Sequence, residues 1–244
     1  MRALVLADIH SNLVSLETII ADTTARGGFD EIWVLGDLVG YGPKPNECIE
    51  MLKAFPHVAV AGNHDRAAVG SITTGDFNPH AAQAARWTAE ALSEDSKSYL
   101  AGLDEVVSKD NFTLAHGTLR DPIWEYLYTV DAAEAHLALQ ETRYSFVGHT
   151  HVPMLVEETA KGDPLMRRLS HEDSVELAEE RLIMNPGSAG QPRDGDPRVC
   201  YALLDSGAAT VSYFRLDYDI RETQRQMRAA GLPPYLIERL AKGR

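Results

Sequence analysis

The stretch Ala3-Leu4-Val5-Leu6-Ala7-Asp8-Ile9-His10 decides how this chain begins to fold, because five apolar residues lead directly into a carboxylate and an imidazole. A short, uninterrupted apolar run is typical of a strand that is buried on both faces of a sheet. In extended backbone, residues two apart point to the same side, so Asp8 and His10 can converge on one ion. Such a pair is weak evidence when it stands alone.

The residues that follow alternate between helix and strand patterns. Apolar residues at helical spacing predict a helix over residues 12–26, which Gly27-Gly28 ends. Residues 32–35 and 58–61 predict two more buried strands, and residues 45–55 between them predict a second helix. This alternation predicts parallel strands joined by right-handed crossovers.

The rest of the chain predicts further strands with helices inserted between them. A strand over 112–115 lies between two expected helical insertions, near 70–103 and 118–142. Alternating apolar residues and turn residues then predict antiparallel strands. These are expected at 154–157, 165–169, 181–184, 199–204 and 209–215, after a further strand at 144–147. We expect an α/β fold in one domain over residues 1–244, in which helices flank two mixed sheets.

The tail over 217–244 is predicted to be helical, with a break at Gly231-Leu232-Pro233-Pro234. Its apolar residues, which include Leu236 and Leu240, leave two interpretations open. They form the surface of a homodimer, or they cap the sheet within one chain. The sequence favours neither.

The composition is that of a globular protein, with 44% hydrophobic and 24% charged residues. We expect no membrane span and no signal peptide, because neither pattern is present. Cys48 and Cys200 are far apart, which predicts buried free thiols and fits a cytoplasmic location. The net charge of −13 argues against duplex nucleic acid as a partner, although bound cations can still attract phosphate to an acidic protein.

Side chains that bind metals follow the predicted strands at the points where the strands end. They are Asp8, His10, Asp37, Asn63, His64, Asp65, His116, His149 and His151. Because sites in parallel sheets form at the carboxyl ends of strands, we expect these side chains to converge at one edge. Imidazole suits Zn, Fe and Ni, and oxygen ligands suit Mn, so the set predicts two divalent ions. Asp37 can bridge them through its two oxygens.

Five motifs stand in the order found in calcineurin-like metallophosphoesterases. They are Asp8-x-His10, Gly36-Asp37, Gly62-Asn63-His64-Asp65, His116 and Gly148-His149-Thr150-His151. The chain resembles this family from residue 3 to about residue 205, and it is most similar to the small bacterial and archaeal phosphodiesterase branch. The resemblance implies a four-layer αββα sandwich. The Gly62–Asp65 motif is expected to be a turn that Gly62 permits.

The resemblance also implies a role for each motif residue. One ion would be held by Asp8, His10 and His151, the other by Asn63, His116 and His149, and Asp37 would bridge both. His64 would not bind the metals; it would donate a proton to the leaving-group oxygen or stabilise the charge that develops there. Asp65 would fix the turn or the His64 imidazole. A metal-bridging hydroxide would then attack phosphorus.

The chain departs from the protein Ser/Thr phosphatases of this family at two motifs. Those enzymes carry Gly-Asp-x-x-Asp-Arg-Gly, where this chain has Gly40 and Tyr41 in place of the second Asp and the Arg. They also carry Gly-Asn-His-Glu, where this chain has Asp65. Both differences argue against a phosphoprotein substrate, and they leave the orienting partner of His64 open.

We therefore expect a dimetal phosphodiesterase that acts on a small phosphate ester such as a nucleotide, with Mn²⁺ favoured for activity. The alternatives are a dinucleoside polyphosphate hydrolase, a phosphomonoesterase and, less favoured because every ligand is intact, a non-enzymatic binding or scaffold protein. Tyr41 and His80 are the candidates for substrate binding. His57, His136 and His171 are expected at the surface or partly buried.

Overall fold

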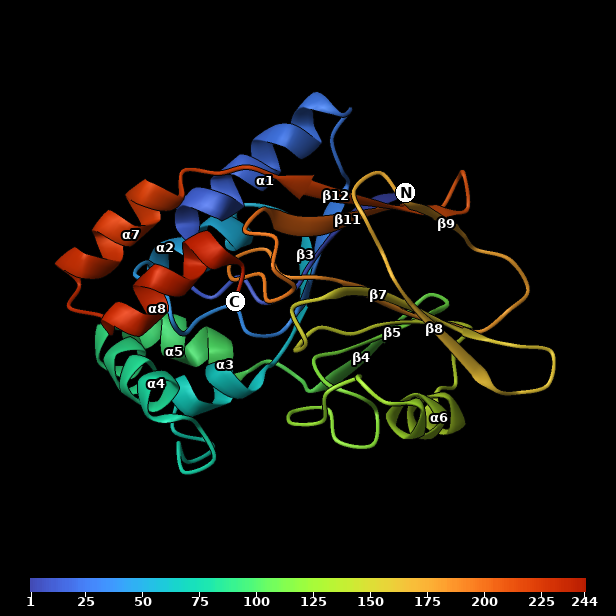
Figure 1. Ribbon diagram of the computed structural model, residues 1–244, viewed down its shortest axis with the longest axis horizontal. Coiled ribbons are helices and arrows are strands. Elements are labelled where there is room, and N and C mark those ends of the chain that lie inside the picture. Colours follow the sequence, from blue (N-terminus) through green and yellow to red (C-terminus); the bar gives the residue numbers. More distant parts are fainter.

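The apolar run at Ala3–Ala7 forms strand β1, which lies inside a six-stranded sheet of the computed structural model of residues 1–244 (Figure 1). β1 pairs in parallel with β2 and antiparallel with β11, so its backbone is hydrogen-bonded on both sides. This first sheet has the order β3 (His57–Val60), β2 (Glu31–Leu35), β1 (Arg2–Leu6), β11 (Val199–Asp205), β12 (Thr210–Leu216) and β9 (Ser174–Glu176).

The second sheet also has six strands and mixes parallel with antiparallel pairs. β6 runs parallel to both of its neighbours, β5 and β10. The order is β4 (Val106–Lys109), β5 (Phe112–Ala115), β6 (Tyr144–Phe146), β10 (Leu182–Pro186), β7 (Pro153–Glu158) and β8 (Pro164–Arg168). β4 and β9 were not predicted from the sequence. Both lie at sheet edges, and the burial of their side chains alternates.

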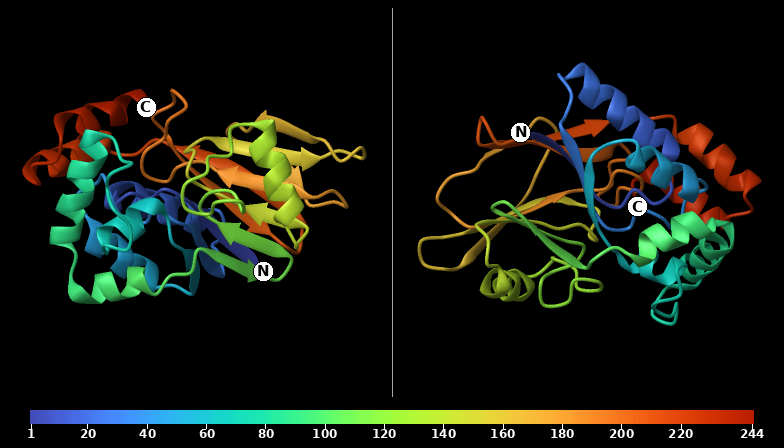
Figure 2. Two further views of the ribbon diagram at one scale, coloured as in Figure 1. Left: turned by 90° about the horizontal axis from the view of Figure 1, so that it is seen from below. Right: turned by 180° about the vertical axis from the view of Figure 1, so that it is seen from behind.

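The two sheets pack face to face, with helices on both outer faces (Figures 1 and 2). Trp33 of the first sheet packs against Phe112 and Phe146 of the second, with ring centroids 5.2 and 6.1 Å apart. A separate apolar cluster joins Leu4 and Ile32, on the other face of the first sheet, to helices α1 and α2. The expected four-layer αββα sandwich is confirmed.

Helices cover the sheets unevenly. α1 and α2 pack on the first sheet and α6 packs on the second, where Ala133 and Leu137 meet Ile183. The helices are α1 (Leu13–Ala25), α2 (Pro45–Lys53), α3 (Asn63–Ala68), α4 (Pro79–Ala91), α5 (Glu94–Ala101), α6 (Val130–Leu139), α7 (Ile220–Ala229) and α8 (Pro234–Arg239), followed by the 3-10 turn Leu240–Lys242. None of them combines the length and the apolar character that a membrane span requires.

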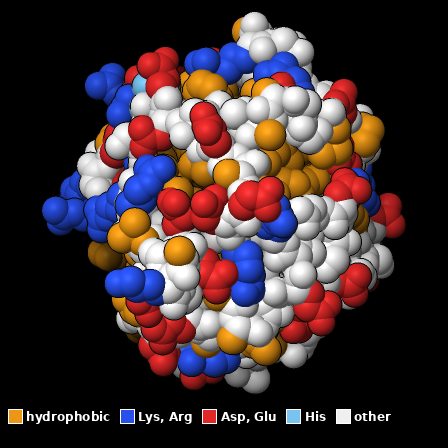
Figure 3. All heavy atoms as spheres, turned by 90° about the vertical axis from the view of Figure 1, so that its right-hand side faces the viewer, with side chains coloured by type: hydrophobic (Ala, Val, Ile, Leu, Met, Phe, Trp, Pro, Cys, Tyr) orange, Lys and Arg blue, Asp and Glu red, His pale blue; other side chains and the backbone are white.

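The helical tail packs onto the inserted helix α4. Met227, Leu236 and Leu240 are buried in one cluster with Ala81 and Ala84 of α4. The apolar face of the tail is therefore covered within the chain, by a helix rather than by the sheet. On the side of the molecule near β8 and β9, other apolar side chains reach the surface among acidic and basic ones (Figure 3).

Two local predictions were wrong. The Gly62–Asp65 stretch is not a free turn, because Gly62 caps the short helix α3 and the next three residues form its first turn. Gly62 has φ −104°, which any residue can adopt, but a Cβ there would lie 2.2 Å from Asp37 Oδ1. The glycine is therefore needed for close approach. Asp8 and His10 are not in extended backbone either, since their φ angles are 54° and 48°.

His136 is fully buried in α6, contrary to the expectation of a surface or partly buried residue. The backbone N–H of Leu119 donates to its Nδ1 at 3.1 Å, so the ring carries its proton on Nε2, which has no partner. Burial, assisted by the charge of Arg181, lowers the pKa of His136 to about 3. An unfolded histidine titrates near pH 6.5, so the unfolded state binds more protons between these two values.

We predict that His136 makes the protein lose stability as the pH falls below about 6.5. His136→Asn should remove this loss, and the amide oxygen of the new side chain can still accept the hydrogen bond from the Leu119 N–H. The free energy of unfolding from urea titrations at pH 5 and pH 7 checks the prediction. The pH-dependent loss in the wild type should exceed that in the variant by about 2 kcal/mol. Equal losses in the two proteins would contradict the prediction.

Candidate metal centre

The predicted ligands come from both sheets and meet where the two sheets adjoin. Asp8 and His10 follow β1, and Asp37 follows β2 of the first sheet. His116 follows β5, and His149 follows β6 of the second sheet. The convergence at strand ends is as predicted, but it takes place between two sheets rather than along the edge of one.

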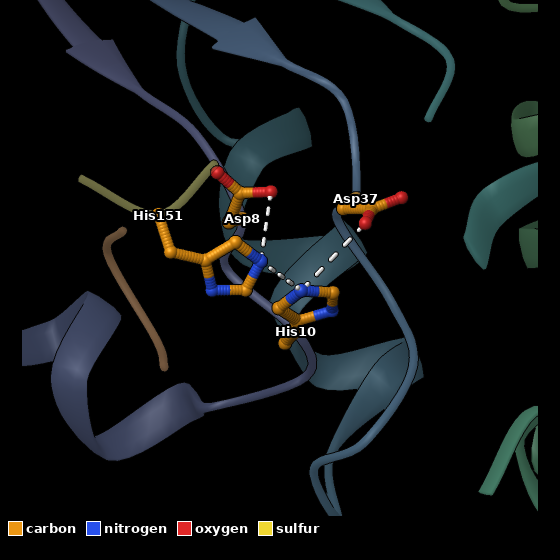
Figure 4. A group of neighbouring side chains, drawn as sticks. All are labelled: Asp8, His10, Asp37 and His151. Atoms are coloured by element: carbon orange, nitrogen blue, oxygen red, sulfur yellow. Dashed lines mark hydrogen bonds and ion pairs between the residues drawn. The ribbon is translucent and has the colours of Figure 1, made fainter. Parts of the chain in front are cut away.

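A first group of side chains joins Asp8, His10, Asp37 and His151 (Figure 4). Nε2 of His10 lies 3.2 Å from Nε2 of His151, and Oδ1 of Asp8 lies 3.3 Å from the same His151 nitrogen. All four side chains are buried, and Oδ1 of Asp8 has no hydrogen-bond partner.

A second group joins Asp37, His116 and His149. Nε2 of His116 lies 2.9 Å from Nδ1 of His149 and 3.2 Å from the amide oxygen of Asn63. His116, His149 and Asn63 therefore lie around one point and come from three loops, as the family resemblance implied.

Asp37 connects the two groups through a single oxygen atom. Oδ2 lies 3.6 Å from Nε2 of His10 and 3.4 Å from Nε2 of His116. The other oxygen, Oδ1, accepts the backbone N–H of His64 at 2.8 Å. The bridging position is as expected, but only one of the two oxygens faces both groups.

Hydrogen bonds to the backbone fix which nitrogen of each imidazole is free. Nδ1 of His10 donates to the Val39 carbonyl, and Nδ1 of His151 donates to the Gln191 carbonyl. A carbonyl oxygen can only accept, so these nitrogens carry the protons. In a neutral ring the opposite nitrogen then presents a bare lone pair.

The same constraint applies to the second group. His116 donates through Nδ1 to the Leu35 carbonyl, and His149 donates through Nε2 to the Trp124 carbonyl. In the first group two bare imidazole nitrogens therefore face one another at 3.2 Å with no proton between them, and in the second group a neutral His116 faces His149 in the same way at 2.9 Å. A divalent cation between them turns this repulsion into coordination. The donor set, of imidazole nitrogen with carboxylate and amide oxygen, fits such ions.

Burial governs the protonation of these groups in the protein. It holds the pKa of His10, His149 and His151 well below the usual value. Burial also raises the pKa of Asp8 to about 8, with a contribution from the Asp37 charge. Burial alone would lower the pKa of His116, but the adjacent Asp37 carboxylate raises it to about 9.

His64 lies beside both groups and belongs to neither. Its ring packs against Tyr41 and Phe77, with centroids 4.3 and 4.7 Å away. Nδ1 is buried without a hydrogen-bond partner, near the place where a Cβ on Gly40 would lie. Nε2 is therefore the nitrogen left to face the pocket. Burial lowers the pKa of His64 to about 4.

The Asp65 carboxylate fixes the loops on either side of it. It accepts backbone N–H groups of Leu38, Val39 and Gly62 at 3.0 to 3.3 Å. These bonds tie the loop after β2 to the start of α3, which is the turn-fixing role expected for it. No hydrogen bond joins Asp65 to the His64 imidazole.

The pocket above the two groups is lined by residues from several loops and has a volume of about 90 Å³, below the range usual for sites that enclose a whole ligand. Tyr41 lines it, as the sequence suggested. His80 is exposed and stacks on Tyr235 instead, so its ring lies outside the pocket lining. The sequence reasoning missed Arg193, which lines the pocket from the loop after β10. No pattern in the surrounding sequence could have drawn attention to it.

We predict that Asp37→Asn weakens metal binding by at least about 100-fold, because the bridging oxygen loses its charge. The metal content of each chain, measured by elemental analysis after equilibration with Mn²⁺ and desalting, checks this. Asp76→Asn is the matched control, since this exposed acid lines the same pocket outside both groups. Two ions retained by folded Asp37→Asn would contradict the bridging assignment.

Comparison with known proteins agrees with this geometry. A crystal structure of a metallophosphoesterase from Sphaerobacter thermophilus is 40% identical, covers all of both chains and has a TM-score of 0.90. An uncharacterized protein of Methanocaldococcus jannaschii is 34% identical and covers 98% of this chain and 97% of its own. Phosphodiesterase YfcE of Escherichia coli is 24% identical, over 86% of this chain and 91% of its own.

The family model that matches this chain is the calcineurin-like phosphoesterase superfamily domain, over residues 1–208, and this range includes every residue of both groups. The tail that packs on α4 lies beyond this range, but it is within the similarity to the Sphaerobacter and Methanocaldococcus proteins. The chain therefore belongs to the calcineurin-like phosphoesterase superfamily, and it is a hydrolase.

Proposed function

We propose that this chain is a two-metal phosphodiesterase that hydrolyses small phosphate esters, with nucleotides or related compounds as substrates. The observation that carries the proposal is the pair of facing imidazole nitrogens in each group, with one oxygen of Asp37 between the two groups. Bound divalent ions would supply Lewis acidity to the phosphoryl group. Asp8, His10 and His151 would hold one ion, and Asn63, His116 and His149 the other.

His64 is proposed to hydrogen-bond the oxygen of the leaving group. Its backbone N–H is tied to Asp37 Oδ1 at 2.8 Å, so the ring keeps a fixed position relative to the metal groups. With Nδ1 enclosed, Nε2 is placed to hydrogen-bond the oxygen that departs from phosphorus. Asp65 acts through the loops that it binds rather than by contact with substrate.

A second candidate, hydrolysis of a dinucleoside polyphosphate, is favoured by the aromatic side chains at the pocket. Tyr126 stacks on His149 with centroids 3.8 Å apart, and Tyr128 stacks on Tyr126. The two tyrosine side chains are 41% and 52% exposed, so a nucleobase can reach them. The pocket itself is closed on one side by contact between Phe77 and Trp124, which favours smaller esters. Plain phosphomonoesterase activity is the other competitor.

Metal identity and cell compartment are further parts of the proposal. We favour Mn²⁺ for activity, because oxygen donors from Asp8, Asp37 and Asn63 accompany the imidazoles. A cytoplasmic location is supported by the two buried free thiols, Cys48 and Cys200.

Hydrolysis of bis-p-nitrophenyl phosphate and of a nucleotide panel, with each divalent metal in turn, tests the function. We expect turnover of the diester with Mn²⁺. Relative rates on diadenosine tetraphosphate and on mononucleotides then separate dinucleoside polyphosphate hydrolysis from phosphomonoesterase activity. The proposal fails if folded protein that has bound metal turns over none of these compounds.

We predict that His64→Ala lowers kcat by about 10²- to 10³-fold, because the hydrogen bond that stabilises charge on the leaving oxygen is lost. Its metal content should remain that of the wild type, since the ring is outside both groups. His171→Ala, on the far loop before β9, serves as the control and should change neither quantity. Loss of metal together with activity in His64→Ala would refute the separation of roles.

A further inference from the structure

Arg193 is the only lysine or arginine that lines the pocket above the metal groups. It lies on the loop between β10 and β11 and shares the pocket wall with Asp37, His64 and His151. Its guanidinium carbon is 5.6 Å from the centre of the Tyr41 ring. The cation is thus held beside the reacting centre by an aromatic side chain.

The guanidinium of Arg193 has no carboxylate partner. Nη2 donates to the side-chain oxygen of Gln191 at 3.0 Å, and Nε is buried with no hydrogen-bond partner. The next arginine in the loop differs, because Arg198 forms an ion pair with Asp196 at 2.7 Å. A buried N–H donor without an acceptor is unfavourable, so the missing acceptor points to a ligand.

The charge of the pocket indicates which ligand this is. Two divalent ions together with the Asp8, Asp37 and Asp76 carboxylates leave a net charge of +1, and Arg193 raises it to +2. Coulomb attraction scales with the charge of the ligand, so this added cation benefits a dianion more than a monoanion. A guanidinium also matches the oxygens of phosphate in shape and in hydrogen bonding.

We propose that Arg193 binds the phosphate group of the substrate and contributes more to the binding of phosphates with two negative charges, namely phosphomonoesters and terminal phosphates, than to the binding of singly charged diesters. This inference rests on the proposed phosphoesterase function. Arg193 donates hydrogen bonds to a non-bridging phosphate oxygen while His64 serves the leaving oxygen. The enzyme therefore also retains inorganic phosphate as a product.

Two substitutions at this position and one control test the role. Arg193→Gln removes the charge, Arg193→Lys keeps it, and Arg198→Gln alters a carboxylate-paired arginine of the same loop. Calorimetric titration of Mn²⁺-loaded protein with inorganic phosphate measures binding without turnover. We expect affinity to fall about 10- to 100-fold in Arg193→Gln, to recover in part in Arg193→Lys and to be unchanged in Arg198→Gln.

Kinetics on two substrates tests the charge preference. In Arg193→Gln, kcat/KM for p-nitrophenyl phosphate should fall further than kcat/KM for bis-p-nitrophenyl phosphate. Equal falls overturn the preference for dianions, and unchanged phosphate affinity with metal retained overturns the binding role. Loss of metal or of thermal stability in both the Gln and Lys variants marks Arg193 as structural and also overturns it. If the wild type turns over no ester, the proposed function fails, while the phosphate titration still decides the role of Arg193.

Discussion

Imidazole nitrogens that face one another across about 3 Å are the constraint on which this molecule depends. Neutral rings repel in this arrangement, and only a shared proton or a cation makes it favourable. The fold tolerates this repulsion because the rings lie on different loops, and a buried strand holds each loop in place. β1 and β2 present one half of the cluster, and β5 and β6 present the other. The two sheets therefore enclose a polar centre whose ligand atoms do not all find hydrogen-bond partners within the chain.

The sequence was most informative where a feature is local. Buried parallel strands are continuous apolar runs, so β1, β2 and β5 could be located closely, and the ligands at their ends could be named. Edge strands such as β4 and β9 escaped notice, because half of their side chains face solvent and carry no strong pattern. Backbone conformation also escaped notice, since Asp8 has a positive φ and its N–H donates to Gly36 in a distant loop, and neither feature has a local sequence pattern.

Contacts between distant segments explain what else the sequence could not supply. Asp65 was assigned to its own turn, but its carboxylate also binds the loop after β2. Arg193 is remote in sequence from every metal-binding motif and carries no motif of its own. Tyr41 joins these regions, because its ring contacts His64 on one side and belongs to the apolar cluster of the tail on the other. The tail therefore supports the pocket indirectly.

The anchors of the four imidazoles are all main-chain carbonyls, at Leu35, Val39, Trp124 and Gln191. A point mutation can replace any side chain, but it cannot delete a carbonyl group. The orientation of the rings is thus protected against sequence drift as long as the loops keep their paths. Substitutions in the pocket wall can therefore change which ester fits without disturbing the rings below it.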